Sequence, residues 1–95
     1  MPTYVVLTTL TDEGRKTLLH NPGRIREVNK EIEAMGITLK DQYALLGQFD
    51  FVNILEAENN EAITRMAVQL GSRGTVSTLT LPAIPTNDFI AGLEK

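Results

Sequence analysis

The sequence contains no cysteine, no tryptophan and a single histidine, His20. Without cysteine the chain has no disulfide, no thiol nucleophile and no zinc–thiolate cluster, and one histidine leaves little for any other transition-metal site. The sequence therefore predicts a protein without a metal or any other cofactor.

The chain also lacks an excess of positive charge and a long apolar run. Nine Lys and Arg stand against twelve Asp and Glu, for a net charge of -3, and the basic residues are scattered, so we expect no nucleic-acid partner. No apolar run approaches the roughly 20 residues that span a bilayer. The start, MPTYVVLTTL, has neither the basic region nor the apolar core of a signal peptide. These features predict a cytoplasmic protein that does not associate with membranes.

What is present is the composition of an ordinary globular domain. The 95 residues are 42% hydrophobic and 22% charged, which is close to the average for folded soluble domains. A chain of this length has too little interior for two cores, so we expect residues 1–95 to form a single domain.

The first half of the chain predicts a strand and two helices. Residues 3–10 are rich in β-branched and aromatic residues, as in a buried strand. Thr11 is a candidate N-cap that can accept from the amide of Glu13 or Gly14 and so start a short helix. The segment His20-Asn21-Pro22-Gly23 ends this helix. A longer helix follows, with Gly36 as its left-handed C-cap. Its apolar stripe consists of Ile25, Val28, Ile32 and Met35.

The second half predicts three strands and two helices. The first of these strands covers residues 38–46 and is expected to alternate, with Leu39, Tyr43 and Leu45 on one side and Thr38, Lys40 and Gln42 on the other. Residues 51–57 are more apolar and suit a central strand, and the short glycine-containing connection before them indicates a hairpin. Residues 58–60 offer N-caps for a helix that ends near Gly71, and the last strand is expected over residues 75–81. A short terminal helix is expected after Pro85, docking Phe89, Ile90 and Leu93 on the body.

The order of these elements is β, α, β, β, α, β, with extra short helices after the first strand and at the C-terminus. This order defines the split βαβ arrangement of ferredoxin-like α+β folds. Right-handed crossovers then place both main helices on one face of a four-stranded antiparallel sheet. The other face of the sheet is left open in a single chain.

We assign the more uniformly apolar side of the strands to the helices, since that side gains most from burial. This assignment places Val5, Leu7, Val52 and Ile54 under the helices. It places on the open face Tyr4, Val6, Thr8, Phe51, Asn53 and Leu55, joined by Val76, Thr78 and Thr80. A large exposed apolar patch usually marks an interface or a ligand groove. The sequence therefore predicts a homodimer or a larger homo-oligomer that assembles through the open face.

Four residues are candidate ligand contacts if this open face encloses a pocket: Thr8, Tyr43, Asn53 and Thr78. Asn53 is the group best able to orient a small molecule, because its amide both donates and accepts hydrogen bonds. The alternative, which we prefer, is that Asn53 makes a hydrogen bond across a dimer interface.

Three stretches resemble the GYD domain family of small proteins: PTYVVLTTLTDEG, YALLGQFDFVNILEA and LGSRGTVSTLTLPAI. The Gly-Tyr-Asp motif that gives the family its name matches Gly47, Phe49 and Asp50, with Gln48 between the glycine and the aromatic residue and phenylalanine in place of tyrosine. The resemblance covers nearly the whole chain. It implies a ferredoxin-like fold related to dimeric α/β-barrel proteins, and it implies no particular activity.

Asp50 can be interpreted as a general base or as part of a turn. A lone carboxylate lacks a partner that would make it catalytic, whereas an aspartate at a hairpin accepts backbone amide hydrogen bonds and Gly47 supplies a positive φ, so we prefer the turn role. His20 is expected to be exposed. Arg24 and Arg26 are expected to be solvated rather than bound to an anion. Glu56 is left open as a partner for Arg73 or for a second subunit.

The leading functional hypothesis is a non-enzymatic oligomeric module that binds a small molecule or a partner protein. The second is a cofactor-free enzyme acting on a small hydrophobic or aromatic substrate in a sheet-lined cavity, which depends on fold analogy alone. An enzyme requires ionisable groups that converge on the cavity, so the positions of His20, Asp50 and Glu56 discriminate between the two.

Overall fold

The computed structural model describes residues 1–95 and has the predicted order of elements. The strands are β1 (Thr3–Leu10), β2 (Thr38–Ala44), β3 (Phe51–Glu56) and β4 (Val76–Ala83), and the helices are α1 (Asp12–His20), α2 (Arg24–Ala34), α3 (Asn60–Gly71) and α4 (Thr86–Leu93). The sheet order is β2-β3-β1-β4 with every neighbouring pair antiparallel. This is the ferredoxin-like α+β architecture expected from the sequence. No helix has both the length and the apolar character needed to cross a membrane.

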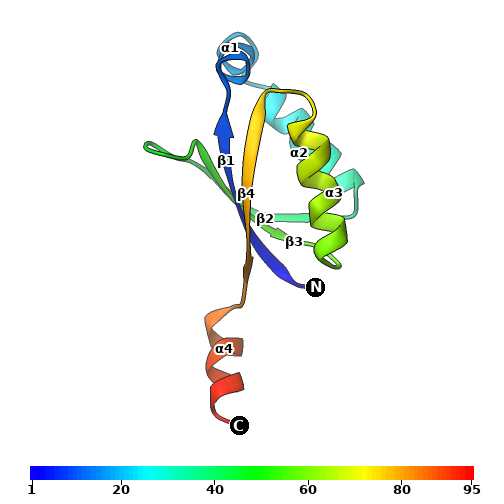
Figure 1. Cartoon of the computed structure of the whole chain (residues 1–95), viewed down its shortest axis with the longest axis vertical. Coiled ribbons are helices and arrows are strands. Elements are labelled where there is room, and N and C mark those ends of the chain that lie inside the picture. The colour runs from blue at the N-terminus through cyan, green and yellow to red at the C-terminus, as the bar shows by residue number, and fades with distance from the viewer.

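Helices α2 and α3 cover one face of the sheet, and the opposite face is bare (Figure 1). The core lies between this pair of helices and the sheet. From the helices and the following turn it contains Ile32, Ile37, Ile63, Met66 and Leu70, and from the sheet Tyr4, Val6 and Leu55, with Ala57 directly after β3.

The predicted assignment of the two sheet faces is wrong. Tyr4, Val6, Thr8, Asn53 and Leu55 are buried beneath the helices instead of lying on the open face. The polar groups among them have partners on the helix side: the Tyr4 hydroxyl donates to Asn60 Oδ1 at the start of α3 over 2.6 Å. Apolar content alone could not distinguish the two faces, because both carry β-branched and aliphatic residues.

The open face consequently carries the side chains that alternate with this buried set. In register across β3, β1 and β4 they are Val52, Ile54, Val5, Leu7, Leu79 and Leu81. Leu79 and Leu81 are 46% and 44% exposed. The open apolar face predicted from the sequence therefore exists, made of the opposite set of residues.

Strand β2 contains an irregularity that changes which side chains share a face. The pairing of β2 with β3 shifts between Leu39 and Asp41, so Lys40 is the extra residue of a bulge. As a result Gln42 lies on the helix side, where it bonds Asn53, and Tyr43 lies on the open side, 62% exposed. Uniform alternation from Thr38 to Leu46 is therefore wrong at Lys40.

The N-terminus of α1 is fixed against the turn before β4. Thr11 caps the helix by accepting from the Gly14 amide over 3.1 Å, and its hydroxyl donates to the Gly74 carbonyl over 2.8 Å. The Thr11 amide donates to the Thr75 carbonyl over 3.0 Å. A Cβ atom on Gly14 would lie 2.1 Å from that same Thr75 oxygen, so this close approach requires glycine.

The C-terminal helix α4 stands away from the body, below the sheet in Figure 1. None of its residues is buried, and Phe89, Ile90 and Leu93 are 54%, 46% and 71% exposed. The expectation that these three side chains dock on the body of their own chain is wrong. Strand β4 also continues past Pro82 to Ala83, because β4 is an edge strand where a missing amide hydrogen is tolerated.

Candidate functional site

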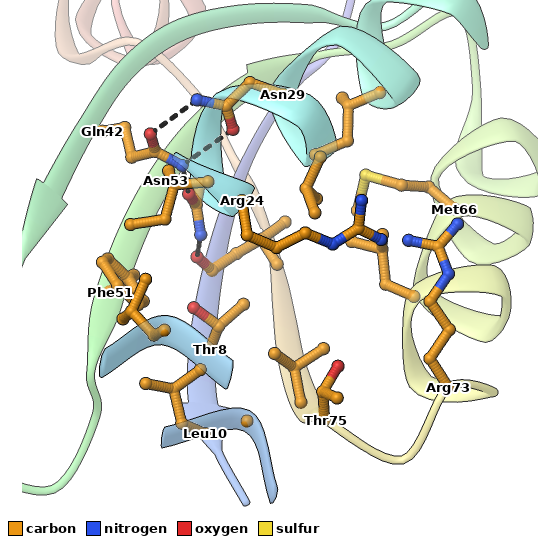
Figure 2. Close-up of a pocket in the computed structure, with 18 of the residues that line it drawn as sticks. Thr8, Leu10, Arg24, Asn29, Gln42, Phe51, Asn53, Met66, Arg73 and Thr75 are labelled. Carbon is orange, nitrogen blue, oxygen red and sulfur yellow. Dashed lines mark hydrogen bonds between the residues drawn. The ribbon is translucent and has the colours of Figure 1, made fainter. Parts of the chain in front are cut away.

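A cavity of about 160 Å³ lies on the helix side of the sheet, between β1, β3 and the two main helices (Figure 2). Eleven of its 20 lining residues are hydrophobic. Val6 and Leu55 form its floor on the sheet, and Val28, Ile32 and Met66 line it from the helices. A single chain thus forms this apolar cavity, which is partly open to solvent.

One wall of the cavity is a network of side-chain amides, drawn with dashed lines in Figure 2. Asn29 and Gln42 exchange two hydrogen bonds of 2.9 and 3.1 Å, Gln42 Nε2 donates to Asn53 Oδ1 over 2.8 Å, and Asn53 Nδ2 donates to the Val6 carbonyl over 2.9 Å. Every side-chain amide oxygen in this network accepts a hydrogen bond. The network joins α2 to β2, β3 and β1, and it satisfies the buried amide of Asn53 within one subunit.

Asn53 therefore does not make the inter-subunit hydrogen bond that we preferred from the sequence. The Gln42 contact depends on the bulge at Lys40, which turns Gln42 inward. The sequence did not predict Gln42 as a lining residue, because uniform alternation does not reveal the bulge. It did not predict Asn29 of α2 either.

The four candidate ligand contacts do not share one face. Thr8 and Asn53 line the cavity, whereas Thr78 pairs with Thr8 on the same side of the sheet but does not line it. Tyr43 lies on the opposite, open face. Their grouping on the open face is therefore wrong.

Thr8 lines the cavity from β1 and has no hydrogen-bond partner among the residues drawn in Figure 2. The residue is only 8% exposed, and no dashed line reaches its hydroxyl. The open space beside it is the cavity. Thr8 is thus a buried hydrogen-bonding group that is free to meet a molecule in the cavity.

Two partly exposed arginines line the cavity, and we call the region between them its mouth. The guanidinium groups of Arg24, from α2, and Arg73, from the loop after α3, extend toward each other in Figure 2. Glu27 lies 2.8 Å from Arg24, and Glu31 bridges Arg24 at 3.5 Å and also pairs with Arg73. Two positive and two negative side chains balance, so the mouth has no uncompensated charge. Arg73 therefore pairs with Glu31 and not with Glu56.

The residues that would indicate an enzyme do not converge. His20 is exposed at the end of α1, and Glu56 lies 3.9 Å from Lys40 at the end of β3. Neither of them lines the cavity, and Asp50 does not line it either. No group of three or more histidine, aspartate or glutamate side chains is positioned to hold a metal ion.

Asp50 has a structural function at the base of the hairpin. Its Oδ2 atom accepts from the Leu10 amide over 2.7 Å, its own amide donates to the Thr8 carbonyl over 2.8 Å, and its carbonyl accepts from the Leu45 amide over 2.8 Å. Gly47 at the turn has a φ of +137°. This is the turn role that we preferred from the sequence. The segment Gly47-Gln48-Phe49-Asp50 ties the hairpin to the end of β1.

The architecture defines a class: ferredoxin-like proteins whose sheet is covered on one face by helices and bare on the other. The match of a family model describing the GYD domain to residues 4–93 shows that this chain belongs to the GYD domain family.

Comparison with other proteins agrees with this assignment. A protein of Thermus thermophilus named glutamine synthetase and cystathionine beta-lyase binding protein is 53% identical over 95 residues, covering 99% of this chain and 100% of that protein. Among solved structures, MtbAldR superposes with a TM-score of 0.63 at 21% identity over 88% of this chain, which spans about half (52%) of MtbAldR. TTHA0845, also of Thermus thermophilus, superposes with a TM-score of 0.56 at 21% identity, over 90% of this chain and 95% of that one. FFRP-DM1 superposes with a TM-score of 0.54 at 22% identity, over 88% of this chain and 100% of FFRP-DM1. At these identities the solved structures show the fold alone.

Proposed function

We propose that this protein is a single-domain, homo-oligomeric adaptor that binds other proteins, with glutamine synthetase and cystathionine beta-lyase as the partners to test first. The observation that supports this proposal is the 53% identity, over the full length of both chains, to a protein named for binding these two enzymes. The positions of His20, Asp50 and Glu56 support a binding role over an enzymatic one, because none of the three lines the cavity and no cluster of acidic or histidine side chains is positioned to hold a metal ion.

We infer that the open sheet face is occupied by a second copy of the chain. Six aliphatic side chains, Val5, Leu7, Val52, Ile54, Leu79 and Leu81, lie together on this face. Two identical faces can pack around a twofold axis, each burying the other. This arrangement removes from water the exposed parts of these side chains, Leu79 and Leu81 above all.

The open sheet face alone has too little area for a stable dimer interface. Four strands spaced about 4.8 Å apart, over six residues of about 3.3 Å each, give a projected area of roughly 400 Å² per copy. Two copies then bury about 800 Å² in total, below the roughly 1,200 Å² of a typical stable interface. Helix α4 supplies further apolar area through Phe89, Ile90 and Leu93.

Helix α4 also depends on packing against another surface. A helix of eight residues is not stable alone in water and depends on tertiary packing. Because its apolar side chains do not pack on its own subunit, we infer that α4 packs on the second copy.

The surface left for partner enzymes is the tip of the β2–β3 hairpin. The hairpin projects beyond the sheet in Figure 1, with Leu46 fully exposed at 104% and Leu45 at 40%. Asp50 holds the base of the hairpin on β1, which keeps the tip in a fixed position. We infer that this apolar tip contacts the partner enzyme.

The test is direct binding to purified enzymes. Glutamine synthetase and cystathionine beta-lyase from the same organism are immobilised separately, and binding of the protein is measured by biolayer interferometry, with an unrelated oligomeric enzyme of similar charge as the control. We expect saturable binding to at least one of the two enzymes, and substantially weaker binding by Leu46→Asp at unchanged oligomeric state. Absence of binding to both enzymes at tens of micromolar protein would refute the adaptor proposal. Unchanged binding by Leu46→Asp would refute the choice of surface alone.

A further inference from the structure

We propose that the cavity between the sheet and helices α2 and α3 binds a small, neutral, mainly apolar molecule that carries one hydroxyl or carbonyl group. The site lies on the side of the sheet opposite the dimer face. It is independent of the adaptor function proposed above and is tested without any partner enzyme.

The volume and the lining set the size and polarity of the ligand. The cavity measures about 160 Å³, and most of its lining residues are hydrophobic. An apolar cavity of about 150 Å³ accommodates benzene and stays dry when it is empty. A single ring with one small substituent therefore fits this space.

Water is a poor occupant of most of this cavity. A buried water molecule requires about two to four polar partners. The amides of Asn29, Gln42 and Asn53 are already bonded to one another and to the Val6 carbonyl. The Thr8 hydroxyl takes no part in this network and is a further polar group on the sheet floor.

Thr8 accordingly defines where the polar group of the ligand lies. Its hydroxyl both donates and accepts, so it pairs with a hydroxyl or a carbonyl. Every fully enclosed side-chain polar atom in the structure already has a hydrogen-bond partner. The Thr8 hydroxyl is therefore not sealed off, and a ligand in the cavity can pair with it.

The mouth of the cavity indicates that the ligand has no net charge. Arg24 and Arg73 are matched by Glu27 and Glu31. An anion would have to displace Glu31 from both arginines, and a cation would meet two guanidinium groups. A neutral molecule passes without breaking either pair.

The probe is phenol, titrated into the isotopically labelled full-length protein and followed by two-dimensional NMR of amide and methyl groups. Benzoate serves as the charged counterpart of the same ring, and toluene as the counterpart without a hydroxyl. We expect saturable shifts with a Kd in the millimolar range or tighter for phenol, at Val6, Ile32 and Met66. Benzoate is expected to bind at least tenfold more weakly.

Two matched variants test the role of Thr8. Thr8→Val removes the hydroxyl and keeps the shape, and it is expected to weaken phenol binding about three- to tenfold while leaving toluene unchanged. Thr78 is the residue opposite Thr8 on β4; it lies on the same face of the sheet but does not line the cavity. Thr78→Val also removes a hydroxyl and is expected to leave phenol binding unchanged. Equal weakening by the two variants would overturn the assignment of Thr8.

A third variant fills the space. Val28→Phe places a ring in the cavity and is expected to abolish binding of both phenol and toluene; if it does not fold, the two threonine variants still decide the question. Four results would overturn the proposal: no saturation by phenol, shifts confined to the open face around Leu79, benzoate binding as tightly as phenol, or a folded Val28→Phe protein that binds phenol normally.

Discussion

Replacing Leu79 tests whether the open sheet face forms the dimer interface. Leu79 lies on the edge strand β4 opposite Leu7 of β1, and it is 46% exposed in the isolated chain. Leu79→Ala removes apolar contact area, whereas Leu79→Asp places a charge where the second copy packs. Neither change affects the core, because the side chain points away from the helices.

The expected magnitude follows from the area that remains to be buried. Complete burial of a leucine side chain is worth about 1.5–3 kcal/mol, and 46% of Leu79 is still exposed, so each copy gains roughly 0.7–1.4 kcal/mol from Leu79 on dimerisation. Because Leu79 occurs twice in a twofold dimer, its total contribution to the free energy of dimerisation is about 1.4–2.8 kcal/mol. Leu79→Ala should therefore weaken the dimer about 10- to 100-fold. Leu79→Asp adds the cost of burying two unpaired carboxylates and is expected to yield monomers.

Sedimentation equilibrium over a wide concentration range measures the dimer Kd, and circular dichroism checks that each variant is folded. Leu46→Asp is the matched control: it makes the same substitution at the fully exposed hairpin tip and is expected to leave the dimer Kd unchanged. A folded Leu79→Asp protein that dimerises like the unmodified chain would refute the assignment of this face, as would an unmodified chain that is monomeric at all concentrations.

Three further predictions concern the hairpin, α1 and α4. Asp50→Ala removes the acceptor of a 2.7 Å hydrogen bond from the amide at the end of β1, and urea unfolding should show a loss of about 1.5–3 kcal/mol, with Asp50→Asn much closer to the unmodified chain. Gly14→Ala forces a Cβ atom to within 2.1 Å of the Thr75 carbonyl oxygen and should cost about 1–3 kcal/mol by thermal unfolding. Gly23 has a right-handed helical conformation, and a Cβ atom there would make only ordinary van der Waals contacts, so Gly23→Ala should be neutral or slightly stabilising. Deleting residues 86–95 removes no buried side chain, so the free energy of unfolding of the monomer should change by less than about 0.5 kcal/mol while the dimer Kd in sedimentation weakens; a large loss of monomer stability would show that α4 packs on its own subunit.

The sequence predicted the elements well because each depends on neighbouring residues. Thr11 caps α1 and Asn59 caps α3, and Gly36 ends the turn after α2 with a φ of +83°. These signals act within a few residues of one another, so they can be recognised without knowledge of the fold. Strand β1 was predicted with the bounds that it has, Thr3–Leu10.

The sequence could not determine which face of the sheet the helices cover. In β1, Tyr4 and Val6 alternate with Val5 and Leu7, and both pairs are apolar enough to be buried. The choice depends on partners distant in the sequence: Asn60 for Tyr4, and Gln42 for Asn53. The contact between Gln42 and Asn53 depends on the bulge at Lys40, which reverses the alternation of side chains in β2. No local sequence pattern revealed this bulge.

What the sequence by itself determined is the order of strands and helices, the caps that bound them, the turn at Gly47 to Asp50, and the existence of an open apolar face. What only the tertiary structure decided is which residues make up that face, where the cavity lies and where α4 stands. Local elements follow from backbone geometry and nearby hydrogen bonds, whereas the facing of a strand with two apolar sides depends on which of its polar groups find partners far along the chain.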